Sequence, residues 1–481
     1  MLAWSLELCS RETLMLTVYD GNRPATRRQF MTIGGLGLGG LTLPALLTGK
    51  ASGARTDSVL TGKSVIFLFQ QGGPSQLETT DPKLDAPSGI RTTNGGLQTS
   101  VPGITFGGTL EQMARIADRL TVIRSFQTGN GGHNIQPIVG KHSRDANIGV
   151  HYSRVAGTTR AESGMPTNMV LFPQAVSTAV TTGKARGNLS STGPYGSTYA
   201  PFIPGGGGQL QKNMTLTLPR ERFFEDRRSV LRQLDRLGRD LESNGQFESL
   251  NEIQQQAYSI LLSGGVASAL DLSQEDPRTV KRYDTSHYAR SHNWDRVSRG
   301  KRGYYTGNAE SLGKLLLLSR RLCEAGAGFI TIHAGYDGVW DMHADGNNLN
   351  MVDGMEAVGR TFDHAVAAFV EDLEERGLTN QILLVCCGEM GRTPRINKRG
   401  GRDHWSRLAP LILHGGGIRP GVVGQSKRDG SEPATAPLTP SHLVSTILHT
   451  VFDVGALRLM RALPAELAEL IQEEPIPGIL A

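Results

Sequence analysis

Side chains that commonly bind divalent metal ions gather in the second half of this 481-residue chain. They comprise three carboxylates and two imidazoles: Asp341, His343, Glu389, Asp403 and His404. Mixed nitrogen and oxygen ligands suit zinc, manganese or calcium, and this many donors would accommodate one or two such ions. The alternative is that Asp341-x-His343 is a hydrogen-bonded loop pair. We expect a metal site because several loops supply the same kinds of ligand.

Arginines crowd the same part of the sequence. Arg392, Arg395 and Arg402 lie between Glu389 and His404, and Arg124 ends an earlier predicted strand. Guanidinium groups match the oxygens of phosphate and sulfate. Together with a metal they stabilise charge on a transferring phosphoryl or sulfuryl group, so we expect all four arginines to bind a substrate anion. The alternative is a structural network in which Arg392 and Arg395 pair with nearby carboxylates.

These loops can meet only if the strands before them belong to one sheet. Apolar runs predict five strands: Val65–Phe69, Leu120–Arg124, Phe329–His333, Ile382–Cys387 and Pro410–His414. Helical patterns separate them at about 109–118, 308–325 and 349–376, and a helix capped by Ser441 follows. Strand–helix alternation predicts an α/β fold, a three-layer sandwich with a mostly parallel, doubly wound sheet. Such sheets bind ligands at the carboxyl ends of their strands.

Two further candidates follow the first two predicted strands. Ser75 comes after the first strand and is a possible nucleophile, with Ser125 and Thr128 as other hydroxyl candidates. His133 follows the second strand and is a candidate catalytic residue. We therefore predict a catalytic pair, Ser75 and His133, beside the metal ligands.

Composition excludes several classes of protein. The formal net charge is +5 and no uninterrupted block of Lys and Arg occurs, so no nucleic-acid partner is expected. Of the four cysteines, Cys386 and Cys387 are neighbours in a predicted strand and would point to opposite faces. No disulfide framework and no CxxC zinc site is indicated.

The N-terminal region predicts export. Arg27-Arg28 precedes a short, glycine-rich apolar stretch, Ile33 to Leu47, and small residues at 51–54 would allow cleavage. We predict a twin-arginine signal region at 1–54, recognised by the twin-arginine translocase, and a periplasmic or secreted protein. The mature chain, 55–481, is expected to form a single domain with an irregular insertion at about 140–218 and no membrane span. The alternative is an arginine pair beside a chance apolar run.

Several motifs resemble one family of secreted proteins, named "domain of unknown function fifteen-oh-one". Besides the leader, they are Gly72-Gly73-Pro74-Ser75-Gln76-Leu77-Glu78, Trp340-Asp341-Met342-His343, Gly388-Glu389-Met390-Gly391-Arg392-Thr393-Pro394 and Gly401-Arg402-Asp403-His404-Trp405. The resemblance covers nearly the whole mature chain. It implies the fold of alkaline phosphatases and arylsulfatases, although fold alone does not fix function.

By order along the chain, the resemblance implies roles for several residues. Asp341 and His343 correspond to an early metal pair of that superfamily, and His404 to a later metal-binding histidine. Glu389 stands where an Asp-His motif is usual, and His133 lies near the position of the nucleophile. The sulfatase signature Cys/Ser-x-Pro-x-Arg is absent, and the first strand lacks the usual metal-binding Asp. A conventional formylglycine sulfatase is therefore not expected.

The sequence favours an exported metal-dependent hydrolase of phosphate or sulfate esters. Its substrate would be a small anionic ester or a sulfated or phosphorylated glycan, attacked by metal-activated water or by Ser75. The alternative is a non-catalytic member of the fold that binds an anionic ligand or a partner protein. A serine esterase is disfavoured, because His414-Gly415-Gly416-Gly417 has no G-x-S-x-G motif to accompany it.

Overall fold

The computed structural model describes residues 59–177, 179–180, 185–205, 265–290, 299–333 and 338–480. It also gives the backbone of three N-terminal strands: β1 (Leu2–Cys9), β2 (Thr13–Asp20) and β3 (Arg23–Pro24). The predicted twin-arginine segment, residues 26–54, lies outside the described residues. The export signal and the division at residue 54 therefore stay predictions.

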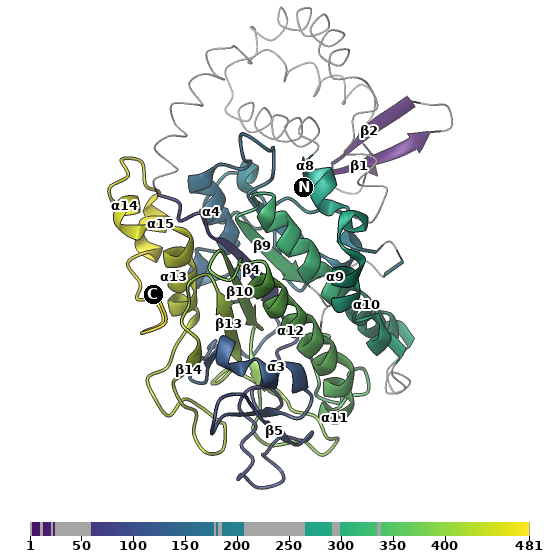
Figure 1. Ribbon diagram of the computed structural model, residues 1–481, viewed down its shortest axis with the longest axis vertical. Coiled ribbons are helices and arrows are strands. Elements are labelled where there is room, and N and C mark those ends of the chain that lie inside the picture. The colour runs from purple at the N-terminus through teal and green to yellow at the C-terminus, as the bar shows by residue number, and fades with distance from the viewer. Residues whose placement is uncertain are drawn as a thin grey trace, which may run out of the picture.

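A seven-stranded sheet forms the middle of the molecule (Figure 1), in the order β14-β7-β13-β10-β4-β9-β8. Its strands are β4 (Ser64–Phe69), β7 (Thr121–Ile123), β8 (Asn168–Leu171), β9 (Phe329–His333), β10 (Ile382–Cys387), β13 (Leu411–Gly415) and β14 (Gly421–Val423). Only β13 runs against its neighbours in this sheet, since every other pairing is parallel. The carboxyl ends of β4, β7, β9 and β10 therefore lie at one edge.

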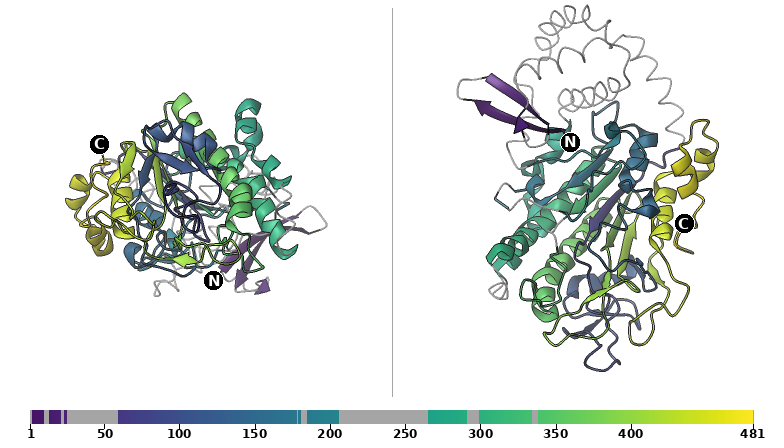
Figure 2. Two further views of the ribbon diagram at one scale, coloured as in Figure 1. Left: turned by 90° about the horizontal axis from the view of Figure 1, so that it is seen from below. Right: turned by 180° about the vertical axis from the view of Figure 1, so that it is seen from behind.

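Both faces of the sheet are covered, which explains why its central strands are mostly apolar. Successive side chains of a strand point to opposite faces. Accordingly Ile66 and Leu68 of β4 join one hydrophobic core, whereas Val65 and Phe67 join the other. Figures 1 and 2 show helices on either side of the sheet. The predicted α/β, mostly parallel, doubly wound sheet is confirmed.

Different helices cover the two faces of the sheet, and the long helices α10 (Arg299–Glu324) and α12 (Arg360–Glu375) lie on the same face. The first core packs against α3 (Glu111–Arg115), α10 and α12. The second packs against α4 (Ile148–Ala156), α13 (Pro440–Val451), α14 (Val454–Arg458) and α15 (Ala465–Leu470). The remaining elements are β5 (Gly96–Gln98), β6 (Thr105–Gly107), α8 (Gly265–Leu270), α9 (Pro277–Arg282), β11 (Gly391–Arg392) and β12 (His404–Trp405).

Helix boundaries follow local chemistry, with two differences from the sequence prediction. The predicted helix 349–376 is α11 (Met351–Gly354), a π-helical turn (Met355–Gly359) and α12 in succession, and Gly377 ends it with φ +67°. Helix α13 is capped by Thr439 rather than by Ser441, because Pro440 is suited to the first helical position.

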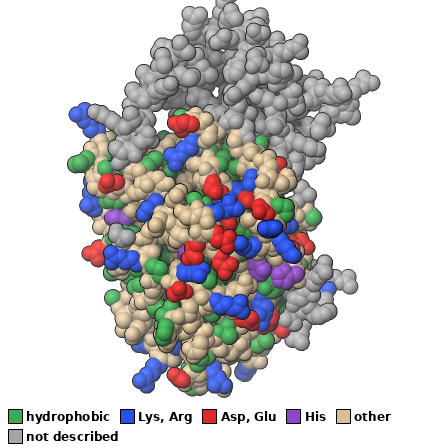
Figure 3. All heavy atoms as spheres, viewed as in Figure 1, with side chains coloured by type: hydrophobic (Ala, Val, Ile, Leu, Met, Phe, Trp, Pro, Cys, Tyr) green, Lys and Arg blue, Asp and Glu red, His purple; other side chains and the backbone are tan. Residues whose placement is uncertain are grey.

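The stretch predicted to be an irregular insertion contains two regular elements. Helix α4 packs on the second core, and β8 pairs in parallel with β9 as the edge strand of the main sheet. None of the helices that the structure describes is both long enough and apolar enough to cross a membrane. On the face seen in Figure 3, acidic and basic side chains are interspersed.

A buried ionic cluster joins α10 to α12. Arg320 is 2% exposed, and its guanidinium lies 2.5 Å from carboxylate oxygens of Glu275 and Glu324 and 3.1 Å from Asp372. Asp372 also accepts a hydrogen bond of 2.9 Å from the Tyr283 hydroxyl. A charge this deeply buried is tolerated only while its partners remain in place.

We expect Asp372→Ala to destabilise the fold by about 3–5 kcal/mol, because it leaves Arg320 and Tyr283 with unmet polar groups in the core. Denaturant unfolding of the variant measures the loss. The control is Glu371→Ala, which removes an exposed carboxylate from the same helix. Equal stability of the two variants would contradict a structural role for the cluster.

Candidate metal centre

One buried carboxylate, that of Asp341, is contacted by three imidazoles. Its Oδ2 lies 3.1 Å from Nε2 of both His133 and His343, and its Oδ1 lies 3.2 Å from Nε2 of His404. The His133 and His404 rings meet edge to face, with centroids 4.4 Å apart. Asp341 is only 3% exposed. The loops expected to converge do so at this residue.

The sheet delivers these side chains to one edge. His133 follows β7, Asp341 and His343 follow β9, and His404 lies in β12, which pairs with β11 just after β10. Since β7, β9 and β10 run in the same direction, their following loops emerge on the same side of the sheet. This is the crevice at which open α/β sheets place their ligands.

Arg392 fixes Asp341 from the protein side. It is fully buried, and its Nη2 donates to Asp341 Oδ1 at 2.7 Å. The same guanidinium donates to the main-chain carbonyls of Gly72, Gly73 and Trp340. The guanidinium of Arg392 therefore anchors the Asp341 carboxylate. Because its donors are directed at Asp341 and at main-chain carbonyls, Arg392 is not placed to bind a substrate.

The glycine pair after β4 permits this close packing. Gly72 and Gly73 have φ of +114° and +83°, which favours glycine. A Cβ on Gly72 would lie 2.6 Å from the main-chain nitrogen of Asp341 and 2.8 Å from Trp340 main-chain atoms. The turn therefore lies directly against the segment that carries Asp341.

Glu389 contacts the centre through His133. Its Oε1 lies 2.9 Å from His133 Nδ1 and accepts a hydrogen bond of 2.8 Å from the Gly72 N–H. Its Oε2 is buried and has no hydrogen-bond partner among the described residues. A buried carboxylate oxygen without a partner is costly, so this corner of the centre is short of positive charge or donors.

The charges of the centre shift the pKa values of its members. Burial alone would lower the pKa of His133, but its hydrogen bonds to Asp341 and Glu389 raise it from 6.5 to about 9. Burial would raise the pKa of Asp341, but hydrogen bonds from the three histidines and the charge of Arg392 hold it well below its usual range. Asp341 is therefore held in its ionised form, in which it attracts cationic groups.

The donor atoms fit a divalent metal ion. Ligand atoms of His133, Asp341 and His404 all lie within 4.8 Å of one another. The Nδ1 atoms of the two histidines face acceptors, Glu389 Oε1 at 2.9 Å and Gly131 O at 3.0 Å, so both Nε2 atoms face the shared carboxylate. Without an ion, these Nε2 atoms must be protonated to donate hydrogen bonds to Asp341, and a bound ion would take the place of those protons. His343 would add a fourth donor.

The centre opens toward solvent on one side. The side chains of His343 and His404 are 23% and 31% exposed, whereas His133 is 9% exposed and Glu389 is fully buried. A ligand would therefore approach past His343 and His404. An accessible position of this kind is what distinguishes catalytic metal sites from closed structural ones.

Several residues predicted for the site lie elsewhere or have other partners. Asp403, which directly precedes β12, is exposed and accepts a hydrogen bond of 3.1 Å from Asn397. Ser75 Oγ is buried and makes no hydrogen bond to the described residues. Neither side chain is joined to the three ligands by a hydrogen bond or ion pair.

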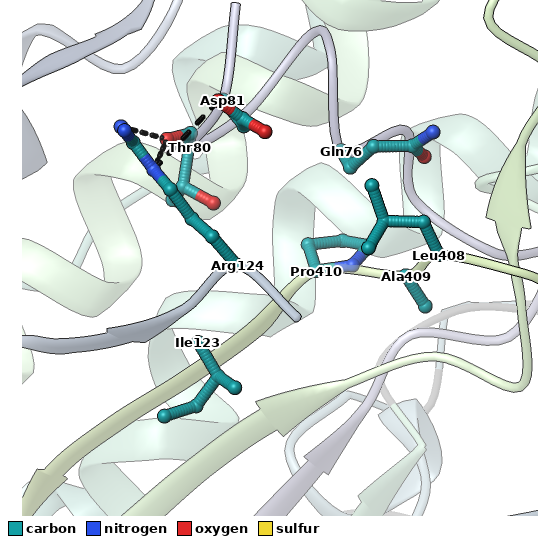
Figure 4. Close-up of a pocket in the computed structure, with 8 residues that line it drawn as sticks. All are labelled: Gln76, Thr80, Asp81, Ile123, Arg124, Leu408, Ala409 and Pro410. Carbon is teal, nitrogen blue, oxygen red and sulfur yellow. Dashed lines mark hydrogen bonds and ion pairs between the residues drawn. The ribbon is translucent and has the colours of Figure 1, made fainter. Parts of the chain in front are cut away.

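The other predicted anion-binding arginines differ in what they contact. Arg402 is buried against Glu78, with Nη2 and Oε1 2.8 Å apart. Arg124 lines a shallow hollow beside Leu408 (Figure 4), and its guanidinium donates to Thr80 O. Only Arg395 has an exposed side chain that makes no hydrogen bond or ion pair with the residues that the structure describes.

Two features of the centre are not apparent from sequence reasoning. His133 is expected there as a catalytic residue, but it lies among the ligand atoms; its place in a polar, glycine-rich loop after a strand is a usable signal. Gly72 is not expected to contribute at all. A Gly-Gly pair shortly after a buried strand signals a close main-chain approach, which the structure shows at Asp341.

The family described as "Protein of unknown function (DUF1501)" matches residues 62–459. No match is found among curated proteins.

Some solved structures are similar over long stretches. The PsFucS1 sulfatase from Pseudoalteromonas sp. is 10% identical, with a TM-score of 0.33 over 84% of this chain and 70% of that one. Ps i-CgsB is 10% identical, with a TM-score of 0.34 over 86% and 77% of the two chains. A Bacteroides thetaiotaomicron protein designated BT33494S-sulf is 15% identical, with a TM-score of 0.21 over 35% and 37%. We therefore base the α/β class of the fold on the order and direction of the strands in this chain's own sheet.

We expect Gly72→Ala to displace Asp341 and to cost about 1–3 kcal/mol more than Gly62→Ala. Gly62 also has positive φ, but a Cβ there would meet nothing within 4 Å, so Gly62→Ala is a control without the clash. Unfolding free energies and metal content of both variants are the measurements. Similar values for the two would show that the close approach is unimportant.

We expect the metal-free protein to lose stability as pH rises through the raised pKa of His133. A histidine whose folded pKa is about 9 stabilises the fold fully below pH 6.5 and loses that contribution as it deprotonates toward pH 9. Unfolding in the presence of a chelator across this range, with His133→Gln as comparison, measures it. A ring of His133 that titrates near 6.5 in NMR spectra would contradict the geometry.

Proposed function

We propose that this chain, which belongs to the DUF1501 family as its motifs predict, is a metal-dependent hydrolase of phosphate or sulfate esters. The observation that carries the proposal is the cluster of His133, Asp341 and His404, whose ligand atoms lie within 4.8 Å of one another. Zinc, manganese or calcium would bind there. The Nδ1 contacts of His133 to Glu389 and of His404 to the Gly131 carbonyl would orient both Nε2 atoms toward the ion.

The charge of the centre favours an anionic substrate. The centre contains two carboxylates, Asp341 and Glu389, and one guanidinium, that of Arg392, which pairs with Asp341. With neutral histidines, a divalent ion would leave an excess of positive charge at the open side of the centre. A small anionic ester, or a sulfated or phosphorylated glycan, would be attracted to that side.

A bound divalent ion supplies Lewis acidity, which lowers the pKa of water and withdraws charge from an ester oxygen. The residues of the chain position the reacting groups: Arg392 holds Asp341, and the open faces of His343 and His404 border the substrate. Water is the proposed nucleophile in preference to Ser75, because Ser75 Oγ is buried without a hydrogen bond to the centre. Arg395 is the exposed arginine proposed to contact the anion.

We place this activity outside the cytoplasm. The proposal rests on Arg27-Arg28 and the apolar stretch after it, which predict export through the twin-arginine translocase into the periplasm or medium. Residues 55–481 would then act as one domain.

The second candidate is a non-catalytic protein that binds an anionic ligand or a partner protein. Three of the four predicted anion-binding arginines, Arg124, Arg392 and Arg402, have internal partners. No hydroxyl nucleophile hydrogen-bonds to the ligand cluster within the described residues. Metal binding without turnover would favour this candidate.

We expect the purified protein to bind zinc or manganese stoichiometrically and to hydrolyse nitrophenyl phosphate or nitrophenyl sulfate. Asp341→Ala should weaken metal binding by more than about 100-fold and abolish turnover, because it removes the shared ligand. Asp85→Ala, which removes an exposed carboxylate, is the control. Elemental analysis and hydrolysis assays are the measurements; wild-type protein without metal or turnover under any ion would refute the proposal.

A further inference from the structure

Glu389 occupies a fully buried position behind His133, at the end of β10. One of its oxygens, Oε1, receives two hydrogen bonds, from the Gly72 N–H at 2.8 Å and from His133 Nδ1 at 2.9 Å. By residue type alone, this carboxylate is as good a candidate ligand as that of Asp341. The contacts of the two carboxylates differ, because only Asp341 faces His404.

The carboxylate determines which nitrogen of His133 carries a proton. An ionised carboxylate only accepts hydrogen bonds, so Nδ1 must be the N–H donor. In the neutral ring Nε2 then holds the lone pair, and this atom lies 3.1 Å from Asp341 Oδ2, on the side of the proposed ion. His404 is arranged in the same way, with Nδ1 on the carbonyl of Gly131 at 3.0 Å.

Glu389 itself is poorly placed to be a ligand. Its Oε1 is already occupied by the two donors, and although Oε2 has no partner among the described residues, Glu389 does not belong to the cluster of ligand atoms within 4.8 Å of one another, which comprises His133, Asp341 and His404. We propose, building on the proposed metal binding, that Glu389 is a positioning residue: it orients His133 for the ion and does not coordinate it.

Glu389 also holds the loop that carries His133. Residues 128–134 are rich in glycine, and Gly131 and Gly132 are exposed. The loop is attached by His133 to the Glu389 side chain, by Asn130 Nδ2 to the Glu389 carbonyl at 3.4 Å, and by Gly129 N to Ser406 O at 3.0 Å. Removing the carboxylate would free both the ring orientation and one attachment of the loop.

The test compares Glu389→Ala and Glu389→Gln with wild type, using zinc affinity by chelator competition and the absorption spectrum of the cobalt-loaded protein. We expect Glu389→Ala to weaken zinc binding by about 10–100-fold. Glu389→Gln should weaken it less, because the amide oxygen can still accept from His133 Nδ1. The cobalt spectrum should report the same number of ligands in all three proteins, and Glu162→Ala, an exposed control, should match wild type.

Two results would overturn the assignment while leaving the proposed function intact. The first is loss of one ligand from the cobalt spectrum in both Glu389 variants, which would make Glu389 a ligand. The second is wild-type zinc affinity in Glu389→Ala, which would leave it without a role. Wild-type protein that takes up neither zinc nor cobalt would overturn both the proposed function and this assignment.

Discussion

The centre depends on compensation of one buried charge. Asp341 is 3% exposed, and a carboxylate removed from water in this way must find opposite charge or hydrogen-bond donors. Arg392 supplies both from the protein side, while three imidazoles contact Asp341 from the other side. Because Arg392 also bonds the carbonyls of Gly72 and Gly73, the same charge pair joins the loops after β4, β9 and β10.

This arrangement explains why the histidines and arginines have different roles. The buried guanidiniums of Arg392 and Arg402 are committed to carboxylates and main-chain carbonyls, so they shape the loops. The imidazoles of His343 and His404 remain partly exposed beside the carboxylate that Arg392 binds from the protein side. A divalent cation is the partner that such a set of donors is suited to bind, and it would leave the open side attractive to an anion.

Much of the fold could be predicted from the sequence because its central strands are buried on both faces. The mostly apolar runs Phe329–His333 and Ile382–Cys387 match β9 and β10. The short edge strands β8 and β14 lack such runs and depend on pairing with a neighbour. Within the site, the rule that ligands follow the carboxyl ends of parallel strands predicted that Asp341, His343, Glu389 and His404 lie close together. It could not show that Asp403 is exposed or that Arg392 and Arg402 are buried, because the course of a loop decides which of its side chains are buried.

The central claim, that a divalent ion binds between His133, Asp341 and His404, is tested most directly by anomalous X-ray diffraction from crystals grown with manganese or zinc. The account predicts an anomalous peak within bonding distance of His133 Nε2, His404 Nε2 and a carboxylate oxygen of Asp341. Crystals of metal-treated protein with no peak at these atoms, and with Asp341 still held by protonated histidines, would contradict it.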